Sequence, residues 1–232
     1  MKSKMIELFN IIIRKRSPII FNDNLRLTPI SSTFGFERGT PIDRYYITSF
    51  IKTQKEYIKG NVLEVADDLY SKKFVSDKVK KIDVLDTKLN NKVTIVGDLT
   101  KIDSLPADQY DCFICTQTLN FIFEINSAID GIYHLLKPGG CLIGTVAGIC
   151  QISRYDMDRW GDYWRFTSAS LSKLFENVFG TKPYIETFGN VATACALLQG
   201  IAVEDLPSIE ILAKSDPNYE VVLGILARKK NK

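Results

Sequence analysis

Carboxylates and hydroxyl groups gather where the β-rich runs of this sequence end. The residues that close these runs include no Lys or Arg: Glu64, Ala66, Asp67, Asp83, Asp86, Asp98, Leu99, Thr116, Gln117, Thr145 and Ala147. Because ligands of an open parallel sheet bind outside the carboxyl ends of its strands, we expect these residues to share one ligand-binding edge. A phosphate-rich ligand would need a glycine loop with a Lys, or a helix N-terminus free of carboxylates. The set instead favours a ligand with ribose hydroxyls, an amino group and a positive charge.

A second polar segment, residues 149–167, contains both tryptophans of the chain, Trp160 and Trp164. It follows the fifth β-rich run, so we expect it to overhang the same edge. Aromatic faces stack on sugar rings or planar molecules, and Asp with Arg can hold hydroxyls or carboxylates. Asp162 is the candidate catalytic base of the segment. In the structural alternative, the two indole rings pack at a helix start and Arg165 forms an ion pair.

Histidine and cysteine limit the chemistry further. His134 is the single His of the chain, so a His pair or a His-rich metal site has almost nothing to draw on. Cys112 and Cys115 form a C-x-x-C pair inside an apolar strand-like run, without a second pair. We expect the five cysteines to be buried thiols in a reducing compartment, no bound metal, and a carboxylate or tyrosine as any base.

Extended and helical patterns alternate after residue 60. Short apolar runs lie at 62–65, 81–85, 93–96, 110–115 and 141–146, and residues 126–136 have helical spacing. Helices near 168–179 and 191–199 and strands near 184–188 and 221–227 complete the expected order. This alternation predicts right-handed βαβ crossovers and a mainly parallel sheet covered on both faces. The predicted fold is α/β, three-layered, Rossmann-like and doubly wound.

Composition excludes several classes of protein. The 232 residues are 45% hydrophobic and 25% charged, as in an average globular chain, which excludes disordered and disulfide-scaffold classes. A net charge of +3 gives no reason to expect nucleic acid as a partner. We expect an N-terminal helix and extended lead-in over 1–40 and one domain over 41–232. The first apolar run is too short and interrupted for a signal peptide or membrane span, so we predict a soluble, cytoplasmic protein.

The segments VLEV, VGDLT, YDCFICTQTLNFI and LLKPGGCLIGT, in this order, resemble a class I S-adenosylmethionine-dependent methyltransferase over residues 40–229. RGTPIDRYYI and TQTL resemble methyltransferase-domain proteins associated with bacterial polysaccharide and glycosyltransferase systems. The resemblance implies a seven-stranded sheet with an antiparallel last strand and S-adenosylmethionine as cofactor. It further implies direct methyl displacement, without metal, onto a small-molecule or glycan-linked acceptor. A homodimer is the oligomeric state that we consider.

The resemblance also implies roles for the edge residues. Asp83 would bind both ribose hydroxyls, with Asp86 as its competitor. Asp98 and Leu99 would bind adenine, although Asp98 could instead cap a turn. The methionine end of the cofactor would contact Glu64, Ala66, Asp67, Thr116 and Gln117. The acceptor would contact Tyr45, Tyr46, Trp160, Trp164 and Arg165.

The segment after the first strand departs from the family pattern. These enzymes usually carry E/D-x-G-x-G-x-G there, because glycine permits a positive φ and a close approach of the cofactor. Here residues 64–70 read EVADDLY, without glycine. Two other functions therefore stay open: a non-catalytic binding or scaffold protein of this fold in a polysaccharide pathway, and a nicotinamide-dependent oxidoreductase. The absence of G-x-G-x-x-G argues against the oxidoreductase.

Overall fold

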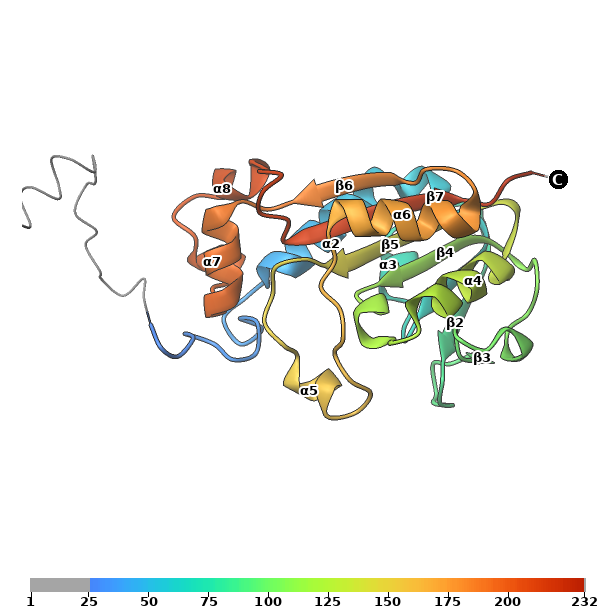
Figure 1. Cartoon of the computed structure of the whole chain (residues 1–232), viewed down its shortest axis with the longest axis horizontal. Coiled ribbons are helices and arrows are strands. Elements are labelled where there is room, and N and C mark those ends of the chain that lie inside the picture. The colour runs from blue at the N-terminus through green and yellow to red at the C-terminus, as the bar shows by residue number, and fades with distance from the viewer. Residues whose placement is uncertain (1–25, 232) are drawn as a thin grey trace, which may run out of the picture.

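A seven-stranded sheet forms the centre of the molecule, in the order β3-β2-β1-β4-β5-β7-β6 (Figure 1). The computed structural model describes residues 26–231, and the expected N-terminal helix lies outside them. The strands are β1 Gly60–Val65, β2 Val79–Asp86, β3 Ile95–Val96, β4 Tyr110–Thr116, β5 Leu136–Ala147, β6 Tyr184–Phe188 and β7 Val222–Arg228. β1 to β5 pair in parallel, and β7 runs antiparallel to both β5 and β6. The predicted doubly wound sheet with an antiparallel last strand is thus confirmed.

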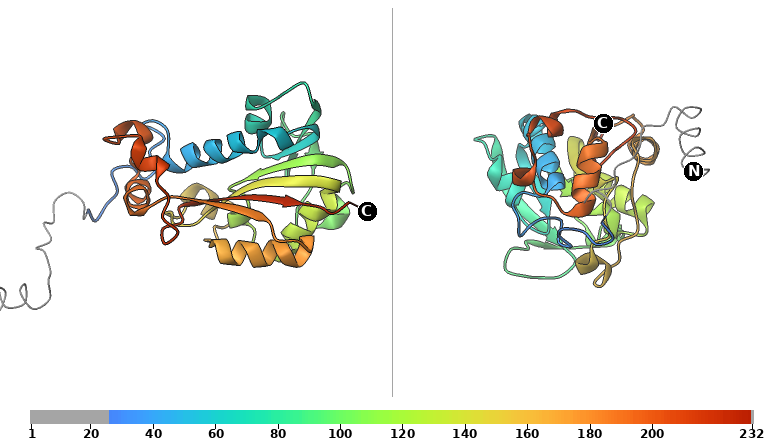
Figure 2. Two further views of the ribbon diagram at one scale, coloured as in Figure 1. Left: turned by 90° about the horizontal axis from the view of Figure 1, so that it is seen from above. Right: turned by 90° about the vertical axis from the view of Figure 1, so that its left-hand side faces the viewer.

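Helices cover both faces of the sheet, so the fold has three layers (Figure 2). The α-helices are α2 Ile42–Thr53, α3 Leu69–Lys73, α4 Ile125–Leu135, α5 Arg154–Met157, α6 Ser168–Phe179, α7 Val191–Gln199 and α8 Glu210–Ala213. Short 3-10 turns lie at Lys55–Tyr57, Ile102–Ser104, Leu119–Phe121 and Val203–Asp205. α2 and α3 lie over one face, and α4 and α6 lie over the other. No helix of the described residues is long and apolar enough to cross a membrane.

The alternation of side chains along β4 builds two cores from one strand. Phe113 and Cys115 pack with α4 and α6, whereas Cys112 and Ile114 pack with α2 on the opposite face. Full burial of a side chain such as Phe113 contributes about 1.5–3 kcal/mol. The two thiols of the C-x-x-C pair therefore point to opposite faces and cannot act together. The expectation of buried cysteines fails at Cys195, which is exposed on α7.

Two elements differ from their predicted form. The Lys-Pro-Gly-Gly segment is not a turn before β5 but an irregular part of it, because the β4 register jumps from Tyr110↔Leu136 to Cys112↔Cys141. Gly139 makes this possible with a φ of 80°, a conformation that favours glycine. The third strand is only two residues long, and the connection from β2 to β3 contains no helix.

Capping residues fix the two helices that follow the sheet edge. Thr167 and Ser170 form a capping box at the start of α6, and Gly180 ends the helix with a φ of 65°. Asn190 caps the start of α7, and Gly200 ends this helix in the left-handed conformation. The carbonyl of Gln199, the last residue of α7, accepts the N–H groups of Ile30 and Ser31. The lead-in is thereby attached beside α7. Between β5 and α6 the chain makes a long excursion through α5, which projects from the body (Figure 1).

Candidate cofactor and acceptor site

The loop after β1 has a glycine-like shape without glycine. Ala66 has a φ of 68°, and its side chain is exposed at the carboxyl end of the strand. The Glu64 carboxylate holds the loop from below, because it accepts N–H bonds from Tyr70 at 3.0 Å and Ser71 at 2.7 Å. Burial raises the pKa of Glu64, although these two N–H groups act in the opposite direction. Asp67 makes a local turn by accepting the N–H of Leu69.

The two acids of β2 have different surroundings. Asp83 lies inside the strand and is buried, and its carboxylate interacts with Lys81, Thr94 and the Tyr110 hydroxyl. Burial pushes the Asp83 pKa upward, but these hydrogen bonds and the Lys81 charge outweigh it and leave the pKa below its usual value. Asp86 is the last residue of β2 and is only half-buried. Asp86 therefore lies at the carboxyl edge of the sheet, whereas Asp83 lies three residues inside the strand.

Asp98 follows β3, and both of its carboxylate oxygens have local partners. Its Oδ1 accepts hydrogen bonds from the N–H and the hydroxyl of Thr100, so the turn-capping alternative is present in the structure. Its Oδ2 lies 3.3 Å from the Lys101 amine. Burial pushes the Asp98 pKa upward, but the Thr100 and Lys101 contacts bring it below its usual value. Leu99 next to it is buried in the core below the loop.

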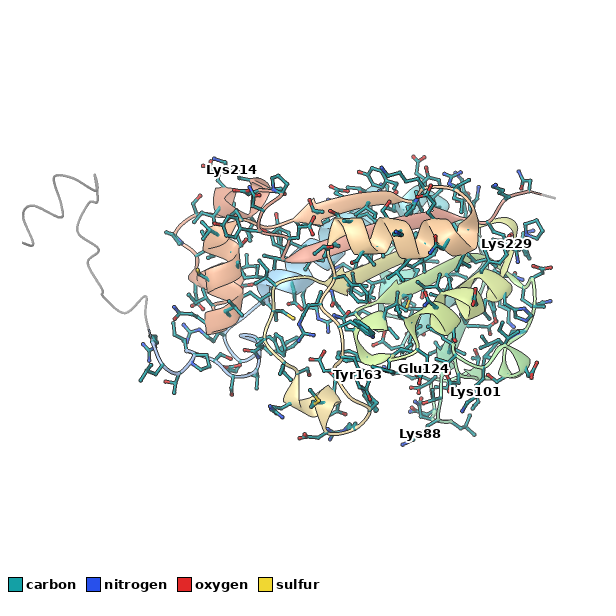
Figure 3. The ribbon with its side chains drawn as sticks, in the orientation of Figure 1. Lys88, Lys101, Glu124, Tyr163, Lys214 and Lys229 are labelled. Carbon is teal, nitrogen blue, oxygen red and sulfur yellow. The ribbon has the colours of Figure 1, made fainter. Side chains whose placement is uncertain are left out.

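A cleft of about 530 Å³ opens beside Asp98. Its lining comes from the residues that follow β3, β4 and β5: Asp98, Thr100, Phe121, Ile122, Phe123, Glu124, Trp160 and Tyr163. Figure 3 shows Glu124 and Tyr163 at the same margin of the molecule. The wall combines aromatic rings with carboxylates and contains no Lys or Arg, which suits an uncharged or cationic planar ligand.

The end of β4 carries polar atoms without a partner. Gln117 has a φ of 47°, and its N–H donates to the Thr145 carbonyl at 2.7 Å. Gln117 Nε2 and Thr145 Oγ1 are both buried and have no hydrogen-bond partner within the described residues. A buried polar group without a partner costs about 1–3 kcal/mol, so a polar ligand at this edge would relieve that cost. Thr116, paired with Thr145 across the two strands, lies beside them.

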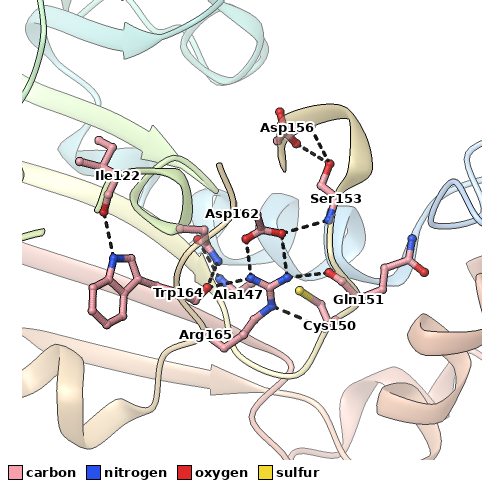
Figure 4. A network of polar contacts seen from close by, with 10 residues as sticks. Ile122, Ala147, Cys150, Gln151, Ser153, Asp156, Asp162, Trp164 and Arg165 are labelled. Carbon is pink, nitrogen blue, oxygen red and sulfur yellow. Dashed lines mark hydrogen bonds and ion pairs between the residues drawn. The ribbon is translucent and has the colours of Figure 1, made fainter. Parts of the chain in front are cut away.

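Asp162, the predicted base, is held in a buried ion pair (Figure 4). Its oxygens lie 2.6 and 2.9 Å from Arg165 Nη1 and Nη2, and Oδ2 also accepts the N–H of Ser153. The Asp162 side chain is only 2% exposed. Arg165 also donates to the carbonyl of Gln151. The hydrogen bond to Asp162 raises the pKa of Arg165. This geometry fits the structural alternative, in which the pair positions the connection between β5 and α6.

Asn120 joins this connection to the loop after β4. Its backbone carbonyl accepts the N–H groups of Tyr163 and Trp164, and its side-chain amide donates to the Trp164 carbonyl at 3.1 Å. Its Oδ1 accepts the N–H of Ala147 at the end of β5. The Trp164 indole donates to the Ile122 carbonyl at 3.0 Å. Hydrogen bonds thus hold the aromatic wall in place, while Phe123, Trp160 and Tyr163 are each at least half-exposed.

The remaining predicted residues fall in different places. Trp160 lies in the cleft, whereas Trp164 packs against the core and stacks on Phe123 at a centroid distance of 6.0 Å. Tyr46 is buried and stacks on Phe188, and the Tyr45 ring makes an edge contact with the Tyr46 ring. Neither tyrosine lines the cleft. His134, in the last turn of α4, lies away from the cleft, and its Nε2 donates to the Leu105 carbonyl.

Sequence reasoning missed the roles of Asn120 and of the aromatic residues 121 and 123. Asn120 lies in the quoted TQTLNFI segment, yet nothing local marks it, because its partners are 27 and 44 positions away. Among the described residues, no group of three or more His, Cys, Asp or Glu is arranged to hold a metal ion.

Known proteins resemble the chain in domain and fold. Residues 58–144 match the family described as "Methyltransferase domain". No curated protein sequence matches the chain. A solved S-adenosylmethionine-dependent methyltransferase from Archaeoglobus fulgidus is 11% identical, with a TM-score of 0.53, over 80% of this chain and 94% of that one.

Two further structures share the fold. The N-methyltransferase NodS from Bradyrhizobium japonicum, in complex with S-adenosylhomocysteine, is 15% identical with a TM-score of 0.53, over 87% of this chain and 94% of that one. The 1,6-didemethyltoxoflavin-N1-methyltransferase from Burkholderia thailandensis is 12% identical with a TM-score of 0.51, over 80% of this chain and 77% of that one. Residues 58–144 thus match a methyltransferase domain, and the described chain has the fold of S-adenosylmethionine-dependent methyltransferases.

Proposed function

We propose that the protein transfers a methyl group from S-adenosylmethionine to a small, uncharged, ring-containing acceptor at the carboxyl edge of the sheet. The observation that carries this proposal is the cleft beside Asp98, because residues after three different strands converge on it. The adenine ring of the cofactor would lie against Asp98 and Ile122, and the acceptor would lie beside it against Trp160. The aromatic and acidic wall disfavours phosphorylated acceptors and suits a heterocycle or a sugar ring. A glycan-linked acceptor therefore stays within the proposal, and its connection to polysaccharide synthesis rests on the sequence resemblance.

The edge residues fit the cofactor in three parts. Asp86 at the end of β2 would accept the ribose hydroxyls, and Asp98 with Ile122 would hold adenine. The orphaned Gln117 and Thr145 atoms would bond to the methionine end, beside the left-handed turn at Ala66. The left-handed turn compensates for the missing glycine, because it gives the loop the backbone conformation that glycine normally supplies.

The chemistry asks little of the protein beyond placement. S-adenosylmethionine supplies an electrophilic methyl group on a positively charged sulfur. The chain must hold the acceptor atom in line with that methyl group and keep both in one orientation. The rigid wall supported by Asn120 and by the Asp162–Arg165 pair would do this. No metal is needed for such a displacement.

Calorimetry with S-adenosylhomocysteine tests the cofactor assignment. We expect binding by the wild-type chain and an affinity at least about tenfold weaker for Asp86→Asn, because the ribose loses a charged acceptor. Asp77→Asn, an exposed acid at the opposite end of β2, is the matched control and should bind normally. Asp83→Asn should lower the unfolding temperature instead.

A non-catalytic binding protein is the second candidate, favoured by the glycine-free loop and by the five-residue length of α3. If neither S-adenosylmethionine nor S-adenosylhomocysteine binds at millimolar concentration, the non-catalytic function replaces the enzyme. Binding of NADH in their place would identify an oxidoreductase.

A further inference from the structure

One of the acids at the ligand edge, Asp43, lies on a helix that precedes the sheet. Asp43 lies in the first turn of α2, and within the described residues it forms no ion pair. Its side chain makes a local hydrogen bond, in which Oδ1 accepts the N–H of Arg44 at 2.8 Å. The neighbouring acid Asp162, by contrast, is fully engaged by Arg165. Asp43 is therefore one of the half-buried carboxylates at this end of the molecule that have no ion pair among the described residues.

The packing of α2 shows where Asp43 lies. Phe50 packs over Gly224 of β7, where an added Cβ would come within 2.4 Å of its ring, and Gly224 pairs with Thr145. One turn earlier, Tyr46 stacks on Phe188, the last residue of β6. The helix thus advances from the middle of the strands to their carboxyl ends. Asp43, about 10 Å before Phe50 along the axis, lies beyond those ends.

The side chain of Asp43 is on the sheet side of the helix. Asp43, Ile47 and Phe50 are spaced i, i+4 and i+7, and the last two are 0% exposed against the sheet. Burial is the main cause of the raised pKa of Cys150, three residues after β5, and the negative charge of Asp43 adds to it. Burial raises the pKa of Asp43, although the charge and the N–H of the adjacent Arg44 act in the opposite direction. An uncompensated carboxylate of this kind is costly unless a cation binds beside it.

We infer that Asp43 is the counter-charge for the sulfonium centre of the cofactor, and that it lets the protein distinguish S-adenosylmethionine from its uncharged-sulfur product. The inference rests on the proposed cofactor site. It assigns to α2, an element before the sheet, a part in cofactor discrimination. Arg165 does not compete for this role, because Asp162 and three backbone carbonyls occupy its guanidinium.

The test is the ratio of two affinities, measured by calorimetry on the full chain with S-adenosylmethionine and S-adenosylhomocysteine. Asp43→Asn should lower the preference for S-adenosylmethionine about tenfold and leave the affinity for S-adenosylhomocysteine unchanged. Asp158→Asn, which removes an exposed acid from the connection between β5 and α6, should change neither affinity. Asp43→Glu keeps the charge and should keep the preference.

The outcomes separate the two proposals. An unchanged ratio in a folded Asp43→Asn protein overturns the role of Asp43 and leaves the cofactor site intact. Equal losses for both ligands would make Asp43 a structural residue and overturn the inference as well. Failure of the wild-type chain to bind either ligand removes the proposed cofactor site itself. Should Asp43→Asn fail to fold, a lost preference in folded Asp43→Glu would contradict the counter-charge.

Discussion

The loop after β1 and the connection between β5 and α6 face the same edge but are stabilised in different ways. The connection is fastened by a buried bidentate ion pair and by the Asn120 amide. The β1 loop depends on one carboxylate, Glu64, and places Ala66 in a conformation that a side chain disfavours. In the proposed site, polar contacts therefore hold the acceptor side in place, whereas the cofactor side accommodates a disfavoured backbone conformation at Ala66.

Breaking the ion pair should have the largest effect. Asp162→Ala leaves the half-buried Arg165 guanidinium without its carboxylate partner and the Ser153 N–H without its acceptor, and should cost about 3 kcal/mol of unfolding free energy. Urea unfolding measures this cost. The double variant Asp162→Leu/Arg165→Met should lose less stability than Asp162→Ala, since no buried charge remains. A loss below about 1 kcal/mol for Asp162→Ala would return Asp162 to the role of a free base.

Removing the Asn120 amide should come next. Asn120→Ala leaves the Ala147 N–H and the Trp164 carbonyl without their partner and should cost about 2–3 kcal/mol. The aromatic wall should loosen, which a change in tryptophan fluorescence would report. Asn126→Ala, an exposed position at the start of α4, is the control and should stay within about 0.5 kcal/mol of wild type.

Asp83 gives a pH-dependent effect of intermediate size. Its folded-state pKa lies below the unfolded value, so its stabilisation is present above about pH 4 and is lost as the pH falls through the folded pKa. Asp83→Asn should cost about 1–2 kcal/mol near pH 7 and less at pH 2. Chemical unfolding at several pH values checks this. A pH-independent loss would show that Asp83 acts through packing rather than charge.

The smallest effect should come from the strained loop, and it should be a gain. Ala66→Gly removes the disfavoured left-handed alanine and should stabilise the protein by about 0.5–1 kcal/mol. The affinity for S-adenosylhomocysteine should be kept or improved, because the backbone shape is retained. Ala147→Gly, in regular β5, should instead destabilise. A destabilised Ala66→Gly would mean that the positive φ carries no strain.

Much of the fold follows from local patterns in the sequence. The alternation of short apolar runs with helical spacing predicts the order of strands and helices, and the capping residues at Thr167, Gly180, Asn190 and Gly200 mark real helix ends. These signals are local, because a strand pattern or a cap depends on residues within a few positions. The local patterns do not give the seven-stranded sheet or its antiparallel last strand, and these two expectations came from the resemblance to methyltransferases.

Tertiary structure decided the roles of individual acids at the edge. Asp83 and Asp86 differ by three positions, and only the end of β2 shows that Asp86 reaches the edge. Asp162 and Asp43 are both acids near aromatic residues in the sequence, yet Arg165 neutralises one and leaves the other uncompensated. The sequence by itself determines which polar groups come to the carboxyl edge. Which of them stay free for a ligand depends on hydrogen-bond partners and on packing from distant segments, because charge and burial are set by the whole fold.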